Sequence, residues 1–180
     1  MAWTIDTSHS TINFSVKHLM VSTARGQFEK FGGTVHFDDA SPIDSTVDVT
    51  INAASINTKD AQRDGHLKSP DFFDVEKYPT ITFKSKTVKH IDATNAKLIG
   101  DLTIKDVTKE VTLDVEYQGQ QKSPFGTTNA GFTAVTKFNR EDFNLGWNVA
   151  LEAGGFLVGK DIKIEIDLEL IKAPEMAAVA

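Results

Sequence analysis

The sequence predicts an all-β fold: a tall, eight-stranded antiparallel barrel with one short helix that caps one end, between the third and fourth strands. Apolar and polar residues alternate with a period of two along most of the chain, which is typical of strands with one wet face. This alternation favours an antiparallel sheet, because the strands of a buried parallel sheet read as continuous apolar runs. Several strands are also about 11 to 15 residues long against a usual five or six, and long twisted strands favour closure into a barrel without free edges.

The predicted strands follow one another with short connections. In the last strand, isoleucine and leucine occupy every second position from Ile162 to Leu170, with charged residues between them. Turn signals such as Ser41-Pro42 and Ser123-Pro124 separate neighbouring strands. The interior of an eight-stranded barrel is either filled by side chains or holds one small ligand. The strands are expected at roughly residues 9–19, 25–39, 44–55, 79–90, 95–105, 109–120, 125–139 and 158–172.

A helix is expected between the third and fourth strands. Asn57 or Thr58 can serve as its N-cap, and Asp60 then falls in the first turn, where the helix dipole favours an anion. Residues 59–68 contain no β-branched side chain, and Pro70 ends the helix by forcing the residue before it into an extended conformation. This short helix is the predicted cap of the barrel.

Two apolar segments interrupt the strand rhythm. Phe72 and Phe73 follow the helix directly, and we expect them either to close the end of the barrel or to form part of its wall. Residues 139–158 are too apolar for a solvated loop and are expected to fold over a barrel end. The whole barrel is predicted to span residues 1–172, followed by a flexible tail at residues 173–180.

Composition excludes several classes of function. The 19 basic and 25 acidic residues give a net charge of −6 without a basic cluster, so no nucleic-acid partner is expected. The chain has no cysteine and therefore no disulfide framework, thiolate nucleophile or cysteine-based metal site. No apolar run reaches transmembrane length. Residues 1–11 lack the features of a signal peptide, which predicts a cytoplasmic protein as the sequence stands, or a periplasmic or extracellular one if a signal has been removed.

Two patterns that suggest chemistry are explained better without it. The run from Gly154 to Lys160, GGFLVGK, matches part of a phosphate loop, but Asp161 follows where Ser or Thr is needed and a strand follows where a helix is needed. The five histidines have no spacing typical of metal ligands, so we predict no metal site and no catalytic residue. His18 continues an apolar strand face and is interpreted as a core or rim histidine.

Arg63, Asp64 and His66 form the most conspicuous polar cluster of the sequence. Arg63 and His66, together with His18, are candidates for a polar rim that binds the head group of a ligand. In the structural interpretation, which we prefer, Arg63 and Asp64 hold the helix on the barrel end through charge-assisted hydrogen bonds.

Six motifs stand in order along the chain and are similar to one known family. Together they resemble the YceI-like family, the polyisoprenoid-binding, lipocalin-like proteins, from Trp3 to Lys172. The motifs are DTSHSTINFSVKHLMVSTARGQFEKFGG (6–33), SINT (55–58), RDGHLKSPDFFDVEKYPTITFKS (63–85), GDLTIKDVTKEVTLDV (100–115), AGFTAVTKFNREDF (130–143) and LVGKDIKIEIDLEL (157–170).

This resemblance implies an elongated eight-stranded antiparallel lipocalin-like barrel around an apolar tunnel for one long amphiphilic lipid, such as a polyprenyl phosphate, an isoprenoid quinone or a fatty amide. It also implies a homodimer and, for many relatives, export. The chain departs from the family pattern at three positions. Met20 and Asn144 stand where glycine is frequent, and Asn129 stands where an arginine often precedes Ala-Gly-Phe. If that arginine touches a head group in relatives, Asn129 argues against a diphosphate ligand.

We therefore predict a carrier or reservoir for a long-chain isoprenoid-type lipid, with no catalytic cofactor and at most transient membrane contact. Two alternatives stay open: a stress-linked structural or interaction module with a closed cavity, and an enzyme that uses His18 or His66 as a base. Residue type and strand phase give the candidate lipid-binding residues Phe14, Val16, Phe28, Phe31, Phe72, Phe73, Phe83, Phe132, Phe138, Phe143, Trp147 and Phe156.

Overall fold

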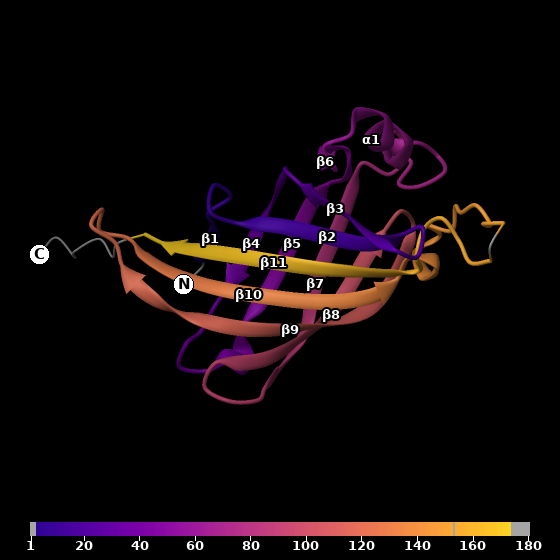
Figure 1. The fold of residues 1–180 in the computed structure, drawn as a ribbon. Helices are drawn as coiled ribbons and strands as arrows, with labels where there is room; N and C mark the ends of the chain where they lie inside the picture. Colours follow the sequence, from indigo (N-terminus) through magenta and orange to yellow (C-terminus); the bar gives the residue numbers. More distant parts are fainter. Residues whose placement is uncertain (1–2, 153, 174–180) are drawn as a thin grey trace, which may run out of the picture.

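A closed antiparallel barrel forms the body of the protein in the computed structural model, as the alternation predicts (Figure 1). The structure describes residues 3–152 and 154–173, so all of the predicted tail beyond residue 173 lies outside the described residues. The one described α-helix is α1 (Ala61–Lys68). The strands are β1 (Trp3–Ile5), β2 (Thr11–His18), β3 (Ser22–Phe28), β4 (Phe31–His36), β5 (Thr46–Asn52), β6 (Ile56–Asn57), β7 (Thr80–His90), β8 (Asn95–Ile104), β9 (Val107–Lys122), β10 (Thr128–Asn139) and β11 (Asp161–Lys172).

Eight of these strands form a closed ring, which confirms the predicted barrel. Their hydrogen-bonded order is β1-β4-β5-β7-β8-β9-β10-β11, and β1 pairs back onto β11. β2, β3 and β6 extend from β11 beyond the ring in that order. β11 therefore has three partners: β10 along its full length, β2 at residues 163–167, and β1 at Leu170 and Ile171.

Neighbouring strands are interrupted at the same level of the barrel. β1 pairs with β4 and β2 pairs with β3, so that two long strands, each interrupted once, lie side by side. β5 pairs with the other edge of β4, and β6 pairs with the other edge of β3. Between β3 and β4, the Glu29 amide donates to the Ser55 carbonyl at 3.1 Å and the Lys30 amide donates to Ser55 Oγ at 3.0 Å. The expected strand at residues 25–39 is thus two strands, because a side chain and a 3-10 turn take over the ladder bonds at the bend.

Side chains that face the interior of the barrel remain partly exposed. In β5 and β11, outward residues are exposed, whereas inward residues such as Val49 and Ile164 are of intermediate burial. A close-packed interior would bury these apolar side chains fully. The middle of the barrel is therefore hollow rather than filled.

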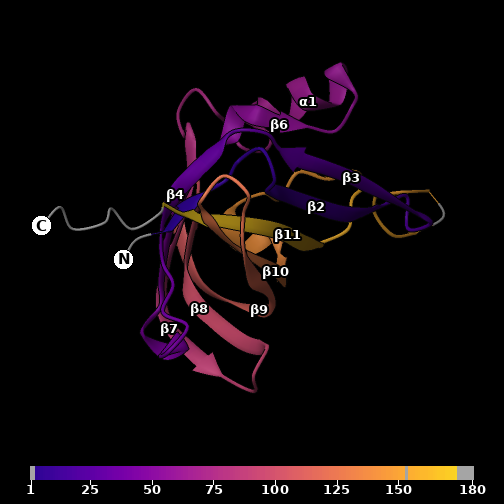
Figure 2. The same ribbon diagram turned by 90° about the vertical axis from the view of Figure 1, so that its left-hand side faces the viewer.

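α1 begins later than the sequence suggested. Its N-cap is Asp60, not Asn57 or Thr58, and the Asp60 side chain accepts from the amides of Gln62 and Arg63 at 3.1 Å each. Asp60 is the N-cap because its backbone is extended and its carboxylate accepts hydrogen bonds from two free helix amides. Figure 2 shows α1 beside β6, over one end of the barrel, as the cap was predicted to lie.

The segment between β10 and β11 covers another part of that end. It starts with a 3-10 turn, Arg140–Phe143, and continues without regular structure except for isolated bridges from Val158 to His18 and from Ala150 to Phe156. No helix in the described part of the chain is long and apolar enough to cross a membrane.

Candidate functional site

A cavity of about 530 Å³ occupies the interior of the barrel. Small-molecule sites typically measure roughly 300–1,000 Å³. The strands supply its wall, and residues of α1 and of the segment between β10 and β11 close one end. Most of the lining side chains are aliphatic or aromatic, so the interior suits an apolar ligand.

Three phenylalanines from different elements form one side of this wall. The ring centroids of Phe14 and Phe28 are 5.5 Å apart, and Phe28 meets Phe73 edge to face at 5.9 Å. Gly26 lies against Phe14, where any Cβ atom would collide with the ring. The glycine in β3 thus makes room for an aromatic wall.

The aromatic pair after α1 serves both of the roles that the sequence left open. Phe72 and Phe73 both line the cavity, and they lie at the end that α1 covers. The Phe73 amide donates to the Leu67 carbonyl at 3.0 Å, which folds the pair back under the helix. The two rings therefore close the barrel and form its wall at the same time.

The wall continues away from α1 as a second aromatic group. Phe37 packs against Tyr117 at 5.3 Å and edge to face against Phe132 at 5.0 Å. Burial raises the pKa of the Tyr117 phenol, and the nearby Asp39 carboxylate adds to this effect. Phe37 and Tyr117 line the cavity but are absent from the predicted wall; Tyr117 could have been found, because it shares the apolar face of residues 111–117.

A ring cluster joins α1 to the segment between β10 and β11. His66 stacks edge to face on Trp147 at 4.6 Å and on Phe72 at 5.2 Å, and Phe72 and Trp147 are themselves 5.5 Å apart. His66 Nε2 lies 2.8 Å from Asp71 Oδ2, which fixes the imidazole plane. The two covers of the cavity therefore meet through His66.

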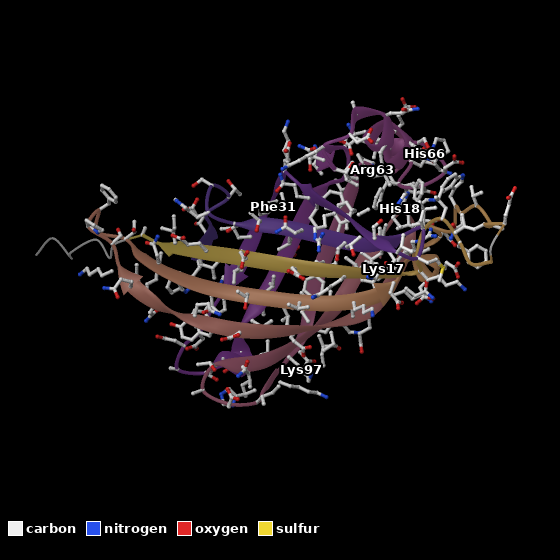
Figure 3. The ribbon with its side chains drawn as sticks, in the orientation of Figure 1. Lys17, His18, Phe31, Arg63, His66 and Lys97 are labelled. Atoms are coloured by element: carbon white, nitrogen blue, oxygen red, sulfur yellow. The ribbon has the colours of Figure 1, made fainter. Side chains whose placement is uncertain are left out.

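Arg63 and Asp64 make the anchoring contacts of the structural interpretation. Arg63 donates from Nε to Thr58 Oγ1 at 2.8 Å and from Nη2 to the Thr58 carbonyl at 2.7 Å. Asp64 Oδ1 accepts from the Thr58 amide at 2.9 Å. These bonds hold α1 against the buried Thr58, directly after β6. Figure 3 shows Arg63, His66 and His18 at the same end of the barrel, away from Lys97.

Arg140 is a residue of this end that the sequence analysis missed. Its side chain is 2% exposed and donates to the carbonyls of Leu145, Trp147, Val158 and Gly159. Burial lowers the pKa of its guanidinium. A single arginine thus binds both ends of the irregular segment that covers the cavity.

Polar groups within the cavity wall are few, and most of them already form hydrogen bonds within the protein. Thr136 Oγ1 donates to the Thr112 carbonyl at 2.8 Å. Among the described residues, no buried side-chain nitrogen or oxygen lacks a hydrogen-bond partner. His18 lines the cavity at the end of β2, as its strand phase suggested. The geometry favours retention of an apolar molecule.

The cavity brings together most of the predicted site residues. His18, Arg63 and His66 also line it. Two candidates lie elsewhere: Phe143 is 1% exposed and packs on Phe138, and Phe156 is 47% exposed on the outside. Both fall in a segment without strand alternation, so residue type alone could not assign their direction. The candidates that line the cavity are Phe14, Val16, Phe28, Phe31, Phe72, Phe73, Phe83, Phe132, Phe138 and Trp147.

A polar cluster outside the cavity joins the end of β1 to β11. The ligand atoms of Asp6, His9 and Glu169 all lie within 4.8 Å of one another. His9 Nδ1 is 2.7 Å from Asp6 Oδ2, and Ser8 donates from Oγ to Asp6 Oδ1 at 2.6 Å. These bonds explain the cluster as a structural turn that holds the N-terminal strand.

Comparison with known proteins relates the whole barrel to one family. The model of the YceI-like domain matches residues 3–170. A UPF0312 protein of Staphylococcus aureus is 44% identical over 170 residues, which cover 93% of this chain and 95% of that protein.

Solved structures are similar over most of the chain. The Campylobacter jejuni YceI protein has a TM-score of 0.73 at 34% identity and covers 87% of this chain and 89% of its own. Burkholderia cenocepacia BcnA has a TM-score of 0.80 at 25% identity and covers 92% and 98%. A polyisoprenoid binding domain from Saccharophagus degradans has a TM-score of 0.64 at 15% identity, which shows the shared fold, over 96% and 98%.

Proposed function

The chain belongs to the YceI-like domain family, and from this membership and the cavity we propose that it binds a long-chain amphiphilic lipid, of the polyisoprenoid or isoprenoid-quinone class, as a carrier or reservoir. The related fold from Saccharophagus degradans is described as a polyisoprenoid binding domain, but its 15% identity supports the fold rather than the ligand. The cavity supports a long apolar ligand, and the resemblance to the family supports its isoprenoid class.

The hollow interior is the observation that carries the proposal. Inward residues of β5 and β11 are partly exposed although they point into the barrel, and the space they surround measures about 530 Å³. A folded domain that needs no ligand gains stability by filling such a space. A long apolar molecule would supply the missing contacts.

Burial of apolar surface explains how the protein could keep a lipid in solution, but not how it could extract the lipid from a bilayer. Each CH₂ group removed from water contributes ~0.8 kcal/mol, so a five-carbon isoprene unit contributes on the order of 3–4 kcal/mol. This gain vanishes for a chain that leaves a bilayer, where it is already out of water. Extraction then depends on the shape of the cavity, its preorganisation and contacts to the head group.

The rim favours a head group of low charge. Arg63 and His66 already bind Thr58 and Asp71. Asn129 does not line the cavity and donates to Glu169 Oε1 at 2.6 Å. Lys17 and Arg25 are two further cations of the lining, so a neutral quinone or a monophosphate fits this arrangement better than a diphosphate, whose charges need more free donors.

Solvent extraction of the purified protein followed by mass spectrometry tests the function. The expected result is one long-chain isoprenoid-type lipid in about stoichiometric amount. Delipidated protein should also take up phylloquinone or geranylgeranyl phosphate, which have isoprenoid chains of equal carbon number. Repeated absence of a lipid, with no uptake of either probe, would contradict the proposal.

A matched pair of variants on β10 checks that the lipid lies inside. Ala134 lines the cavity, whereas Val135 is exposed on the outer face. Ala134→Leu should reduce phylloquinone occupancy at least about threefold by filling space. Val135→Leu should bind as the wild type does. Phe73→Trp narrows the same cavity and should also lower occupancy; equal occupancy in all variants would place the lipid elsewhere.

Two rival functions and two further predictions have their own tests. An enzyme acting on an isoprenoid lipid would lose turnover in His18→Ala or His66→Ala, whereas a carrier would show no turnover to lose. A closed structural module would take up neither probe.

The homodimer and the compartment stay predictions. The homodimer follows from the resemblance and is measured by sedimentation, and the compartment follows from the N-terminal sequence and is measured by fractionation of cells.

A further inference from the structure

Exposed apolar side chains gather at one end of the barrel. Among the described residues, nine large hydrophobic side chains are exposed, and five of them belong to two loops at this end. We call these five the apolar tip. They are Leu19 at 42%, Met20 at 64%, Val21 at 84%, Val149 at 46% and Phe156 at 47% exposure.

The two loops of the apolar tip are joined to each other. The Leu19 amide donates to the Leu157 carbonyl at 2.9 Å, and the Met20 side chain packs against Gly155. Figures 1 and 2 both show the turn between β2 and β3 beside the segment that precedes β11, projecting from the barrel. The tip is therefore one surface rather than two unrelated loops.

The turn at this tip contradicts the usual residue preferences. The Val21 amide donates to the His18 carbonyl at 3.2 Å, and Leu19 and Met20 have φ of +52° and +64°. The loop is Leu19–Val21, between the paired residues His18 and Ser22, and a β-turn with positive φ at both central residues strongly prefers Asn-Gly. Leu-Met is unfavourable here both for the backbone and for hydration, which an apolar partner outside the chain would explain.

The apolar tip is continuous with the cavity. His18, which precedes the tip, lines the cavity, and so do Leu157 and Val158, which follow Phe156. Trp147, two residues before Val149, lines the cavity and covers its end. A partner seated on the tip would lie at the edge of the cavity.

Two lysines flank the tip. Lys17 forms no ion pair with any described residue, and Lys160 Nζ lies 3.8 Å from Glu141. Both side chains are exposed. Apolar side chains that project between lysines are typical of proteins that rest at a bilayer surface, where the lysine stems lie along the apolar layer and the ammonium groups stay at the head groups.

We propose that the apolar tip docks the barrel on a lipid bilayer, so that the end of the cavity covered by α1 and by the segment before β11 lies at the membrane that supplies its ligand. This inference rests on the proposed function, since a lipid ligand is what makes a bilayer the relevant partner. It assigns the unfavourable Leu-Met turn a role in docking, separate from binding inside the barrel.

Co-flotation with phosphatidylcholine vesicles tests the proposal. The wild type should float with the vesicles, and Leu19→Asn combined with Met20→Gly should lower the bound fraction about tenfold, since binding scales with buried apolar area. Because Asn-Gly suits this turn, the variant should fold, which thermal unfolding checks. Phe125→Ser is the control, because Phe125 is 90% exposed on a different hairpin.

Uptake of phylloquinone separates docking from binding. From vesicles, the tip variant should load about tenfold more slowly, whereas phylloquinone delivered from cyclodextrin should load it to the same level as the wild type. Equal flotation of the variant, or loss of flotation in Phe125→Ser, would overturn the docking proposal. Dissociation of a dimer in the variant with unchanged flotation would show a self-interface instead. Flotation without phylloquinone uptake by either route would support docking and contradict the proposed function.

Discussion

Arg140 shows how one side chain can hold an irregular segment in place. It is buried among four carbonyl groups from both ends of the cover between β10 and β11, and it pairs with no carboxylate of residues 3–152 and 154–173. The planar guanidinium with five donors suits this role better than an ammonium group. The sequence could not reveal it, because an arginine after a strand reads as a surface residue.

Replacing Arg140 should strongly destabilise the protein. Arg140→Met leaves several buried carbonyls without donors, each costing roughly 1–3 kcal/mol, so a loss of at least ~3 kcal/mol in the free energy of unfolding is expected. Arg140→Lys should lose less, because it keeps one cationic donor group. Urea unfolding measures both; a loss below ~1 kcal/mol in Arg140→Met would show that the carbonyls find other donors.

The turn at Asp6 should make stability depend on pH. Hydrogen bonds from Ser8 and then His9 lower the pKa of Asp6 from 3.8 to about 2, and the bond to Asp6 raises the pKa of His9 above 6.5. The Asp6 contribution is complete above its unfolded pKa and is lost as the pH falls towards about 2. The His9 contribution is complete below 6.5 and is lost as the pH rises through its folded pKa.

Asp6→Asn removes both contributions. Its difference from the wild type in free energy of unfolding should be largest between about pH 4 and 6.5, and should shrink towards pH 2 and as the pH rises through the folded pKa of His9. Urea titrations across this range measure it, with Asp48→Asn on an exposed strand position as the control. A difference independent of pH would contradict the assigned bonds.

At the scale of elements, α1 is held at both ends, although none of its residues is fully buried. Its start is fixed by the Asp60 cap, by the bonds that Arg63 donates to Thr58 and by the bond that Asp64 accepts from the Thr58 amide. Near its end, His66 stacks on Trp147 and Leu67 packs against the core. A helix of eight residues is marginal by itself, so such caps decide whether it forms.

Loss of the N-cap at Asp60 should therefore destabilise α1 before it affects the barrel. Asp60→Ala removes the acceptor of two helix amides and should cost ~1 kcal/mol, whereas Asp60→Ser should restore most of it. Hydrogen exchange of the amides in residues 62–68 should accelerate in the alanine variant before the barrel amides change. Uniform acceleration throughout the chain would show that α1 and the barrel open together.

Phe143 shows that the sequence does not predict where a side chain points in a segment without strand alternation. It was expected in the cavity wall but packs in the fully buried cluster against Phe138. Phe143→Trp should therefore overpack the core and cost ~1–3 kcal/mol without narrowing the cavity. Reduced phylloquinone occupancy with unchanged thermal stability would contradict this placement.

Local backbone conformation explains why glycine would suit two positions at which the resemblance implies it. Met20 and Asn144 occupy these positions, and both have positive φ, at +64° and +58°. Asn tolerates this region well, whereas Met does so at a cost of ~1–2 kcal/mol. A sequence shows that such a residue is unusual, but the conformation that makes it so appears only in the folded chain.

At the scale of the whole molecule, the alternation of apolar and polar residues predicts the barrel, and the cap signal before residue 61 together with Pro70 predicts its helix. The alternation could not predict the bends, because the side chain of Ser55 replaces ladder bonds between segments distant in sequence. It could not separate a hollow interior from a packed one either, since Val49 and Ile164 would be apolar in both. The cavity depends on the circumference of the ring, which no single strand encodes.

An unfilled barrel should gain stability when its space is reduced. Ala134→Leu adds three carbons inside the cavity and should raise the free energy of unfolding of the lipid-free protein by about 1–2 kcal/mol. The same variant should hold less phylloquinone, so stability and occupancy should change in opposite directions. A less stable Ala134→Leu protein would show that the wall near Ala134 is packed.

The triple pairing of β11 also has a consequence for synthesis. This last strand contacts β10, β2 and β1, and the ring closes only through Leu170 and Ile171. Until β11 has been synthesised, β10, β2 and β1 have open edges and no sealed interior exists. The barrel can therefore close only once β11 is free to pair, in a slow step dominated by pairings between distant segments. Until that step, the nascent chain depends on protection of these edges from other chains.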